Sequence, residues 1–192
     1  MQANWANTIF QNTAVFGALA SSSSEGTLLG TNNEQPIIKA GHFCLGRGRL
    51  INILAKGVFS NTGTPTLTFQ LRLGTTSGSS YLSGASIGVS AAITTQSGVT
   101  NQFWQLELDL VNTLAGVGSG NVTLLGAGKV ESPGGFASPG WYPLEPTTPP
   151  TATWTQVIQG DLAQYLNLSA TWSASSSSNT IACQYLRVMA MN

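Results

Sequence analysis

The sequence predicts an all-β protein: a single-domain, jelly-roll-like antiparallel β-sandwich of about eight to ten strands. Three observations support this prediction. Apolar and polar residues alternate over short segments, and Gly-, Pro-, Asn- or Ser-containing turns separate those segments. Charged residues make up only 7% of the 192-residue chain, against about 25% in a typical soluble domain. Ser, Thr, Asn, Gln and Gly fill the solvated positions instead, which favours strands and turns over surface helices.

The clearest strand pattern lies in Val58–Gly74. From residue 67 to 73 every second residue is apolar, and side chains alternate faces along a strand, so one face is expected to be buried: Leu67, Phe69, Leu71 and Leu73. The preceding Asn61–Pro65 reads as a turn, because Gly63 can adopt a positive φ and Pro65 suits the entry of a strand. With the apolar run before it, this unit is predicted to be an antiparallel hairpin.

The remaining segments are assigned by the same alternation and by the turns between them. The segment Gln102–Val111 is the second clean strand, with its apolar residues on one face and Glu107 and Asp109 on the other. The strands expected in order are Thr13–Leu19, Arg47–Phe59, Thr66–Leu73, Ala85–Ile93, Gln102–Val111, Asn121–Val130, Thr153–Ile158, Gln164–Trp172 and Thr180–Met191, and Thr27–Leu29 and Pro36–Ala40 are short strand candidates. Long connections over the ends favour a jelly roll over a barrel.

Two segments interrupt the alternation. Residues 1–26 form a predicted N-terminal arm that carries Trp5 and Phe10, ahead of a sandwich domain at 27–192. The loop at 132–151 holds six of the eight prolines, with Trp141 and Tyr142 in its middle. Proline fixes φ and lacks an amide proton, so this segment is not expected to form a central strand. It is either a contact surface or a loop folded back over the open end of its own sandwich.

The charge balance limits the partners. Seven basic and seven acidic side chains cancel, and a net charge near zero promotes association. Such a surface suits a protein packed in an assembly, or a monomer solubilised by hydroxyl groups. The chain has no basic stripe for phosphate contacts, so direct nucleic-acid binding is not expected. It has no apolar stretch of about 18 residues, so no membrane contact is expected.

The sequence lacks the combination of residues that an enzyme needs. His42 is the single histidine and has no partner ligand at metal-binding spacing. Cys44 and Cys183 each lie beside an apolar strand pattern and are interpreted as buried, reduced thiols, with a disulfide between them as the open alternative. The strand neighbours Glu107 and Asp109 resemble a glycosidase carboxylate pair, but residues i and i+2 commonly share a solvated strand face. We therefore expect no catalytic residue, no metal and no cofactor.

The order of several sequence blocks resembles a known group of proteins. The blocks are Gly48–Ile51, Ser60–Phe69, Arg72–Thr75, Phe103–Glu107, Leu168–Ile181 and Tyr185–Val188. Together they resemble β-rich virion structural proteins of tailed bacteriophages, which are head decoration (cement) proteins or tail and fibre components. The resemblance covers about 27–130 and 166–192 and leaves out the arm and the proline-rich loop. It implies no catalytic residues.

The resemblance implies a capsid decoration protein on the outer surface of the virion, which bridges capsomers as a homotrimer bound to the major capsid protein. Aromatic anchors dominate interface energetics, so the candidate assembly contacts are Trp5, Phe10, Trp141 and Tyr142. The first alternative is a tail, fibre or baseplate module that binds a host surface glycan; exposed aromatics gathered in one concave patch would favour it. The second alternative is a glycoside-cleaving enzyme that uses Glu107.

Overall fold

The computed structural model describes residues 6–13, 15–29, 35–39, 49–75, 82, 84–115, 120–138, 140–146 and 155–191. These residues form fourteen strands in one large antiparallel sheet that does not close, which confirms the all-β antiparallel fold class. Ten strands are five residues or longer, and β2, β3, β4 and β8 have two residues each. The bounds are β1 Ala6–Asn12, β2 Leu19–Ala20, β3 Gly26–Thr27, β4 Ile37–Ile38, β5 Leu50–Ser60, β6 Thr66–Gly74, β7 Ala85–Ser90, β8 Ile93–Thr94, β9 Gln102–Ala115, β10 Asn121–Glu131, β11 Trp141–Glu145, β12 Thr155–Gln159, β13 Gln164–Trp172 and β14 Thr180–Met191.

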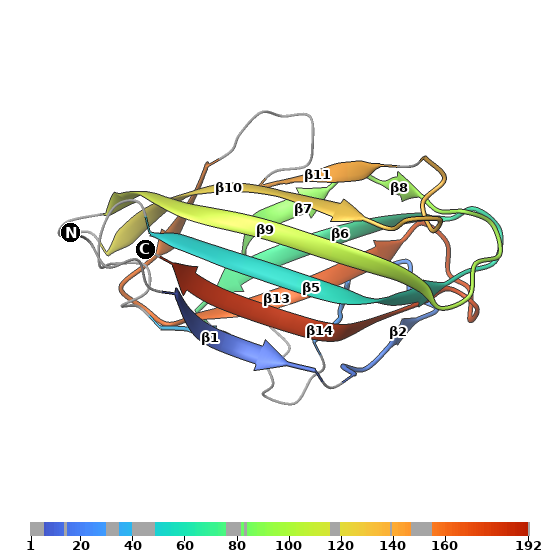
Figure 1. The fold of residues 1–192 in the computed structure, drawn as a ribbon, viewed down its shortest axis with the longest axis horizontal. Coiled ribbons are helices and arrows are strands. Elements are labelled where there is room, and N and C mark those ends of the chain that lie inside the picture. Colours follow the sequence, from blue (N-terminus) through green and yellow to red (C-terminus); the bar gives the residue numbers. More distant parts are fainter. Residues whose placement is uncertain are drawn as a thin grey trace.

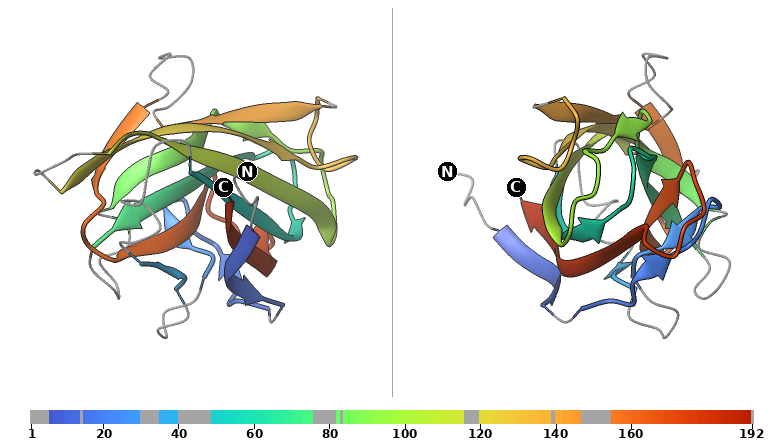
Figure 2. Two further views of the ribbon diagram at one scale, coloured as in Figure 1. Left: turned by 60° about the vertical axis from the view of Figure 1, so that its left-hand side comes forward. Right: turned by 90° about the vertical axis from the view of Figure 1, so that its right-hand side faces the viewer.

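The open sheet folds over to make two facing layers. Its strand order is β1-β14-β5-β9-β10-β11-β7-β6-β13-β3. Strands β1, β14, β5, β9 and β10 form the front layer in Figure 1, with β7, β6 and β13 behind it. The end-on view in Figure 2 shows the strands curling around a central core. Strand β11 joins the layers along one side, because it pairs with β10 and with β7.

Large aromatic side chains fill the space between the layers. Trp104 on β9 packs against Phe69 on β6 with ring centroids 5.1 Å apart. Phe59 on β5 packs against Trp172 on β13 at 6.1 Å. All four side chains are buried. These contacts between β9 or β5 and the opposite layer hold the two halves of the sheet together by burial of apolar surface.

The predicted hairpin at Val58–Gly74 is wrong, although both of its strands exist. Strand β5 pairs with β14 and β9, whereas β6 pairs with β7, β8 and β13. The turn between them is a corner that leads from one layer to the other. Buried Asn61 holds this corner, because its amide donates to Gln96 O at 2.9 Å and its Oδ1 accepts from Val99 N at 3.0 Å. Alternation predicted which face of each strand is buried, but not which layer each strand joins.

The described part of the N-terminal arm is integrated into the sandwich. Strand β1 pairs with β14 along the side of the front layer, so the strand lies at Ala6–Asn12 and not at the predicted Thr13–Leu19. Phe16 is only 2% exposed, and its amide donates to Cys183 O at 3.0 Å. Phe16 is therefore a core residue, and the segment that carries it packs as part of the domain.

Glu25 ties the end of this arm to the back layer. Both of its carboxylate oxygens accept from the Arg72 guanidinium at 3.0 Å, and Oε1 also accepts from Ser169 Oγ at 2.5 Å. Burial works to raise the pKa of Glu25, but the hydrogen bonds from Arg72 and Ser169 and the Arg72 charge outweigh it and hold the pKa below its ordinary value. The folded state therefore gains stability from this group above the ordinary carboxyl pKa and loses it as the pH falls through the lowered value.

The proline-rich segment is only partly a loop. Its residues Trp141–Glu145 form β11, which includes Pro143. This corrects the expectation of a continuous loop at 132–151. At Pro143 the strand pairs with β10 alone, since its pairing with β7 begins at Leu144. A proline is tolerated there because only one side of the strand needs hydrogen-bond donors.

Phe136, in the turn before β11, folds back over the core. It is 2% exposed and stacks on Phe59 with ring centroids 6.0 Å apart. Tyr142 packs edge-on against Phe136 at 5.4 Å. This part of the segment thus closes one end of the sandwich with aromatic side chains, which is the second of the two interpretations left open by the sequence.

Cys183 is a free, buried thiol. Burial raises its pKa to about 12, although weaker backbone hydrogen bonds act in the opposite direction. A thiol with such a pKa carries almost no thiolate at neutral pH and is a poor nucleophile or metal ligand. Cys44 and His42 lie outside the described residues. Within those residues, no helix is long and apolar enough to span a membrane.

Candidate functional site

The outer face of the front layer gathers an unusual share of the charges. Six of the chain's fourteen acidic and basic side chains lie on this face, three of each sign: Lys56, Glu107, Asp109, Lys129, Glu131 and Arg187. They come from β5, β9, β10 and β14, which are neighbours in the sheet. In a chain with 7% charged residues, this outer face therefore holds half of the charged groups among the residues that the structure describes.

Alternation along β9 produces the acidic part of this face. Trp104, Leu106 and Leu108 are fully buried and point into the core, so the residues between and after them point outward. Glu107 and Asp109 are therefore side by side on the outer face, as the sequence predicted. Neither is fully exposed, because the neighbouring strands β5 and β10 flank them.

A single amide holds the two carboxylates. Asn52 on β5 lies opposite Asp109 in register. Its Nδ2 donates to Asp109 Oδ1 at 2.7 Å and to Glu107 Oε1 at 3.3 Å. The Asn52 Oδ1 atom lies 3.5 Å from the Arg187 guanidinium on β14. These contacts fix the position of the carboxylates and leave most of their acceptor capacity unused.

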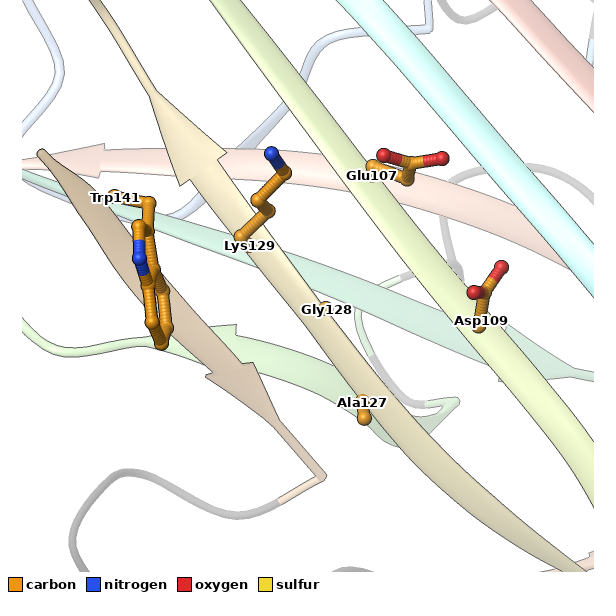
Figure 3. A pocket seen from close by; sticks show the side chains of 6 residues that line it. All are labelled: Glu107, Asp109, Ala127, Gly128, Lys129 and Trp141. Atoms are coloured by element: carbon orange, nitrogen blue, oxygen red, sulfur yellow. The ribbon is translucent and has the colours of Figure 1, made fainter.

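Beside the carboxylates the surface is hollowed into a shallow, open groove of about 310 Å³. Figure 3 shows its lining residues on three consecutive strands. Strand β9 supplies the two carboxylates, β10 supplies small residues and an ammonium group, and β11 supplies an indole ring: Glu107, Asp109, Ala127, Gly128, Lys129 and Trp141. Ala127 lies opposite Asp109 and leaves that part of the groove free of a long side chain, whereas Lys129 lies opposite Glu107 (Figure 3).

Close strand packing requires the glycine in this lining. A Cβ atom at Gly128 would lie 2.3 Å from Glu107 O and 2.9 Å from Leu108 Cα, both backbone atoms of β9. Any side chain at this position would therefore push β10 away from β9 and distort the groove. Gly128 contributes only its backbone to the lining, between the carboxylates on one side and Trp141 on the other (Figure 3).

The charge in the groove is mixed. Lys129 Nζ lies 3.6 Å from Glu131 Oε2, and both side chains are more than a third exposed, so this ion pair contributes little to stability. The lining itself holds two carboxylates and one ammonium group. Among the residues that the structure describes, no group of three or more His, Cys, Asp or Glu side chains could hold a metal ion.

The structure describes three of the four candidate contact residues. Trp141 is 64% exposed and lines the groove. Phe10 and Tyr142 are half-buried and pack against the core, so each has less surface for a partner than expected. Trp5 lies outside the described residues. Sequence reasoning identified Trp141 and the carboxylates separately, but it missed Asn52 and Lys129 and the fact that these groups share one face.

The arrangement of the carboxylates differs from that of a glycosidase site. Glu107 and Asp109 lie on one strand, share one hydrogen-bond donor, and line the same side of the groove (Figure 3). Glycosidase carboxylates flank the scissile bond, one on each side of it. The far side of this groove is formed by Trp141 instead.

Comparison of the chain with known protein families and with curated proteins gives no match. The resemblance to phage virion proteins therefore stays a prediction.

Proposed function

We propose that this chain is a non-enzymatic structural protein of a tailed-bacteriophage virion: a capsid decoration (cement) protein that bridges and stabilises capsomers. Its partners are the major capsid protein and further copies of the chain, as a homotrimer on the outer capsid surface. The order of the sequence blocks and the nearly uncharged composition support this proposal. Several modest contacts per trimer suffice, because each contact after the first is effectively intramolecular.

The observation that carries the proposal is the edge of the sheet at β1. Within the described residues, β1 pairs with β14 on one side and with no strand on the other. Its sequence, ANTIFQN, holds no charge and no proline, and its pairing with β14 has one register shift. At the opposite end of the sheet, β3 and β4 have only two residues each.

Such an edge is suited to assembly. An unpaired strand offers backbone N–H and C=O groups to another chain, and proteins usually protect it with lysine, proline, short length or a β-bulge; of these β1 has only the one register shift. The short strands β3 and β4 have that protection, whereas the seven-residue β1 lacks charge and proline. We infer that another chain in the assembly covers β1 by adding a strand to the sheet.

A lysine at the exposed Gln11 of β1 tests this contact. We expect Gln11→Lys to weaken binding to capsids that lack the protein by about tenfold or more, because a charge at the edge opposes strand addition. Co-sedimentation with such capsids measures the loss. The matched control is Gln96→Lys, which adds the same charge at an exposed turn position and should bind like the parent.

The result is interpretable only if both variants unfold at the same denaturant concentration as the parent. Equal capsid binding by Gln11→Lys, Gln96→Lys and the parent would show that β1 is not the contact. Failure of the parent chain to sediment with capsids would overturn the decoration function itself.

A further inference from the structure

We propose that the groove between β9 and β11 is a binding site for a neutral saccharide, with Trp141 as the stacking surface and Glu107, Asp109 and Lys129 as hydrogen-bonding groups. This inference goes beyond attachment to a capsid and does not depend on it. It rests on the exposed ring, the polar groups that face the same groove, and the charge of the lining.

The indole ring is the first part of the argument. Trp141 lies at the start of the five-residue strand β11, and its side chain is 64% exposed. The next residue, Tyr142, instead packs against Phe136. A tryptophan side chain carries a large, flat apolar surface, so an exposed ring offers a face on which an apolar part of a ligand can stack. The aliphatic C–H face of a pyranose ring offers a matching flat apolar surface.

The polar groups are the second part. Each carboxylate can accept about four hydrogen bonds, and Asn52 uses only one acceptor oxygen on each. Lys129 can donate three hydrogen bonds and is not buried. A ligand rich in hydroxyl groups satisfies both kinds of partner, because a hydroxyl donates to a carboxylate and accepts from an ammonium group.

The charge of the lining selects among such ligands. Two carboxylates and one ammonium group give the groove a net negative charge, and Glu131 lies 3.6 Å from that ammonium nitrogen. An anionic sugar or a phosphate would meet repulsion from the carboxylates and only one cation. A neutral saccharide avoids this repulsion, and the shallow, open form of the groove suits a chain that lies along the surface.

The shape of the groove also fits an extended ligand. The carboxylates and the indole ring line its two sides, and between them Ala127 and Gly128 leave the part beside Asp109 open, next to Lys129 (Figure 3). One sugar ring stacked on Trp141 would place its neighbour over the small residues, within reach of the carboxylates. A monosaccharide cannot make both contacts at once, so it should bind more weakly than a longer neutral chain.

Titration followed by NMR tests the proposal on the full chain. The indole N–H signal of Trp141, assigned with Trp141→Phe, is monitored while neutral hexasaccharides are added: maltohexaose, cellohexaose, mannohexaose and chitohexaose. We expect at least one of them to shift this signal. Because Trp141→Ala lacks the indole signal, isothermal titration calorimetry compares the variants: Trp141→Ala should bind that saccharide at least about tenfold more weakly than the parent. The anionic probe hexagalacturonate should bind the parent more weakly than the neutral saccharide does.

Phe103→Ala is the matched control, since Phe103 is also an exposed aromatic on β9 but does not line the groove. It should leave the saccharide affinity unchanged. The proposal is overturned if no neutral probe at millimolar concentration shifts the Trp141 signal, or if Trp141→Ala and Phe103→Ala behave alike. It is also overturned if Trp141→Ala abolishes capsid binding without any saccharide response, which would make Trp141 a capsid contact.

Discussion

Replacing Trp104 by alanine is expected to lower the free energy of unfolding by about 3–5 kcal/mol. Trp104 is fully buried between the layers and packs against Phe69. Its ring also covers Gly57 on β5, where a Cβ atom would lie 2.9 Å from two ring atoms. Alanine would therefore open a cavity between the central strands of both layers. Urea unfolding followed by circular dichroism measures the change.

Two variants make this prediction specific. Phe103→Ala removes an aromatic ring from the neighbouring, exposed position and should change the free energy of unfolding by no more than about 0.5 kcal/mol. Trp104→Phe keeps most of the ring and should cost less than Trp104→Ala, because the indole Nε1 is buried without a hydrogen-bond partner. Equal losses for Trp104→Ala and Phe103→Ala would contradict the two-layer packing described above.

Phe16→Ala is expected to cost about as much, again about 3–5 kcal/mol. Phe16 is 2% exposed and belongs to the core, although it lies in the segment that sequence patterning assigned to an N-terminal arm. Val15→Ala is the control, since the Val15 side chain is 66% exposed and its truncation should have little effect. The same urea unfolding experiment measures both variants. A tolerated Phe16→Ala would show that the arm is peripheral.

This packing changes how the N-terminal segment should be tested. Deleting residues 1–26 would remove β1, the core residue Phe16 and the Glu25 carboxylate that accepts from Arg72 and Ser169. Loss of capsid binding after such a deletion would then report loss of folding as much as loss of a contact. A single exposed substitution in β1, such as Gln11→Lys, separates the two.

Sequence alone predicted most of the long strands and the buried faces of the clearest ones, but it misplaced β1, missed β11 and did not predict how the strands pair. The alternation in β6 and β9 depends on residues that are local in sequence, and the structure buries the faces that it predicted. The corner at Asn61 depends on partners at Gln96 and Val99 that are distant in sequence. No local sequence pattern encodes those contacts. The sequence therefore predicts a hairpin between β5 and β6, where the chain instead crosses from one layer to the other.

The groove was predictable in its parts and not as a whole. Alternation placed Glu107 and Asp109 outward, and the proline-rich context singled out Trp141. These side chains lie on one face only because β11 pairs with β10. The prolines of this segment, including Pro143 within β11, predict a loop there and not a strand. Phe10 and Tyr142 stay predicted assembly contacts, and the structure adds that both are half-buried and pack partly against the core.

Imaging is the most direct test of the proposed function. Phage capsids that lack the protein are incubated with the purified chain and examined by electron cryomicroscopy. We expect extra density on the outer capsid surface, at symmetric positions between capsomers, with each copy contacting its neighbour or the shell through β1. An undecorated shell, or density on the tail alone, would contradict the assignment as a capsid decoration protein.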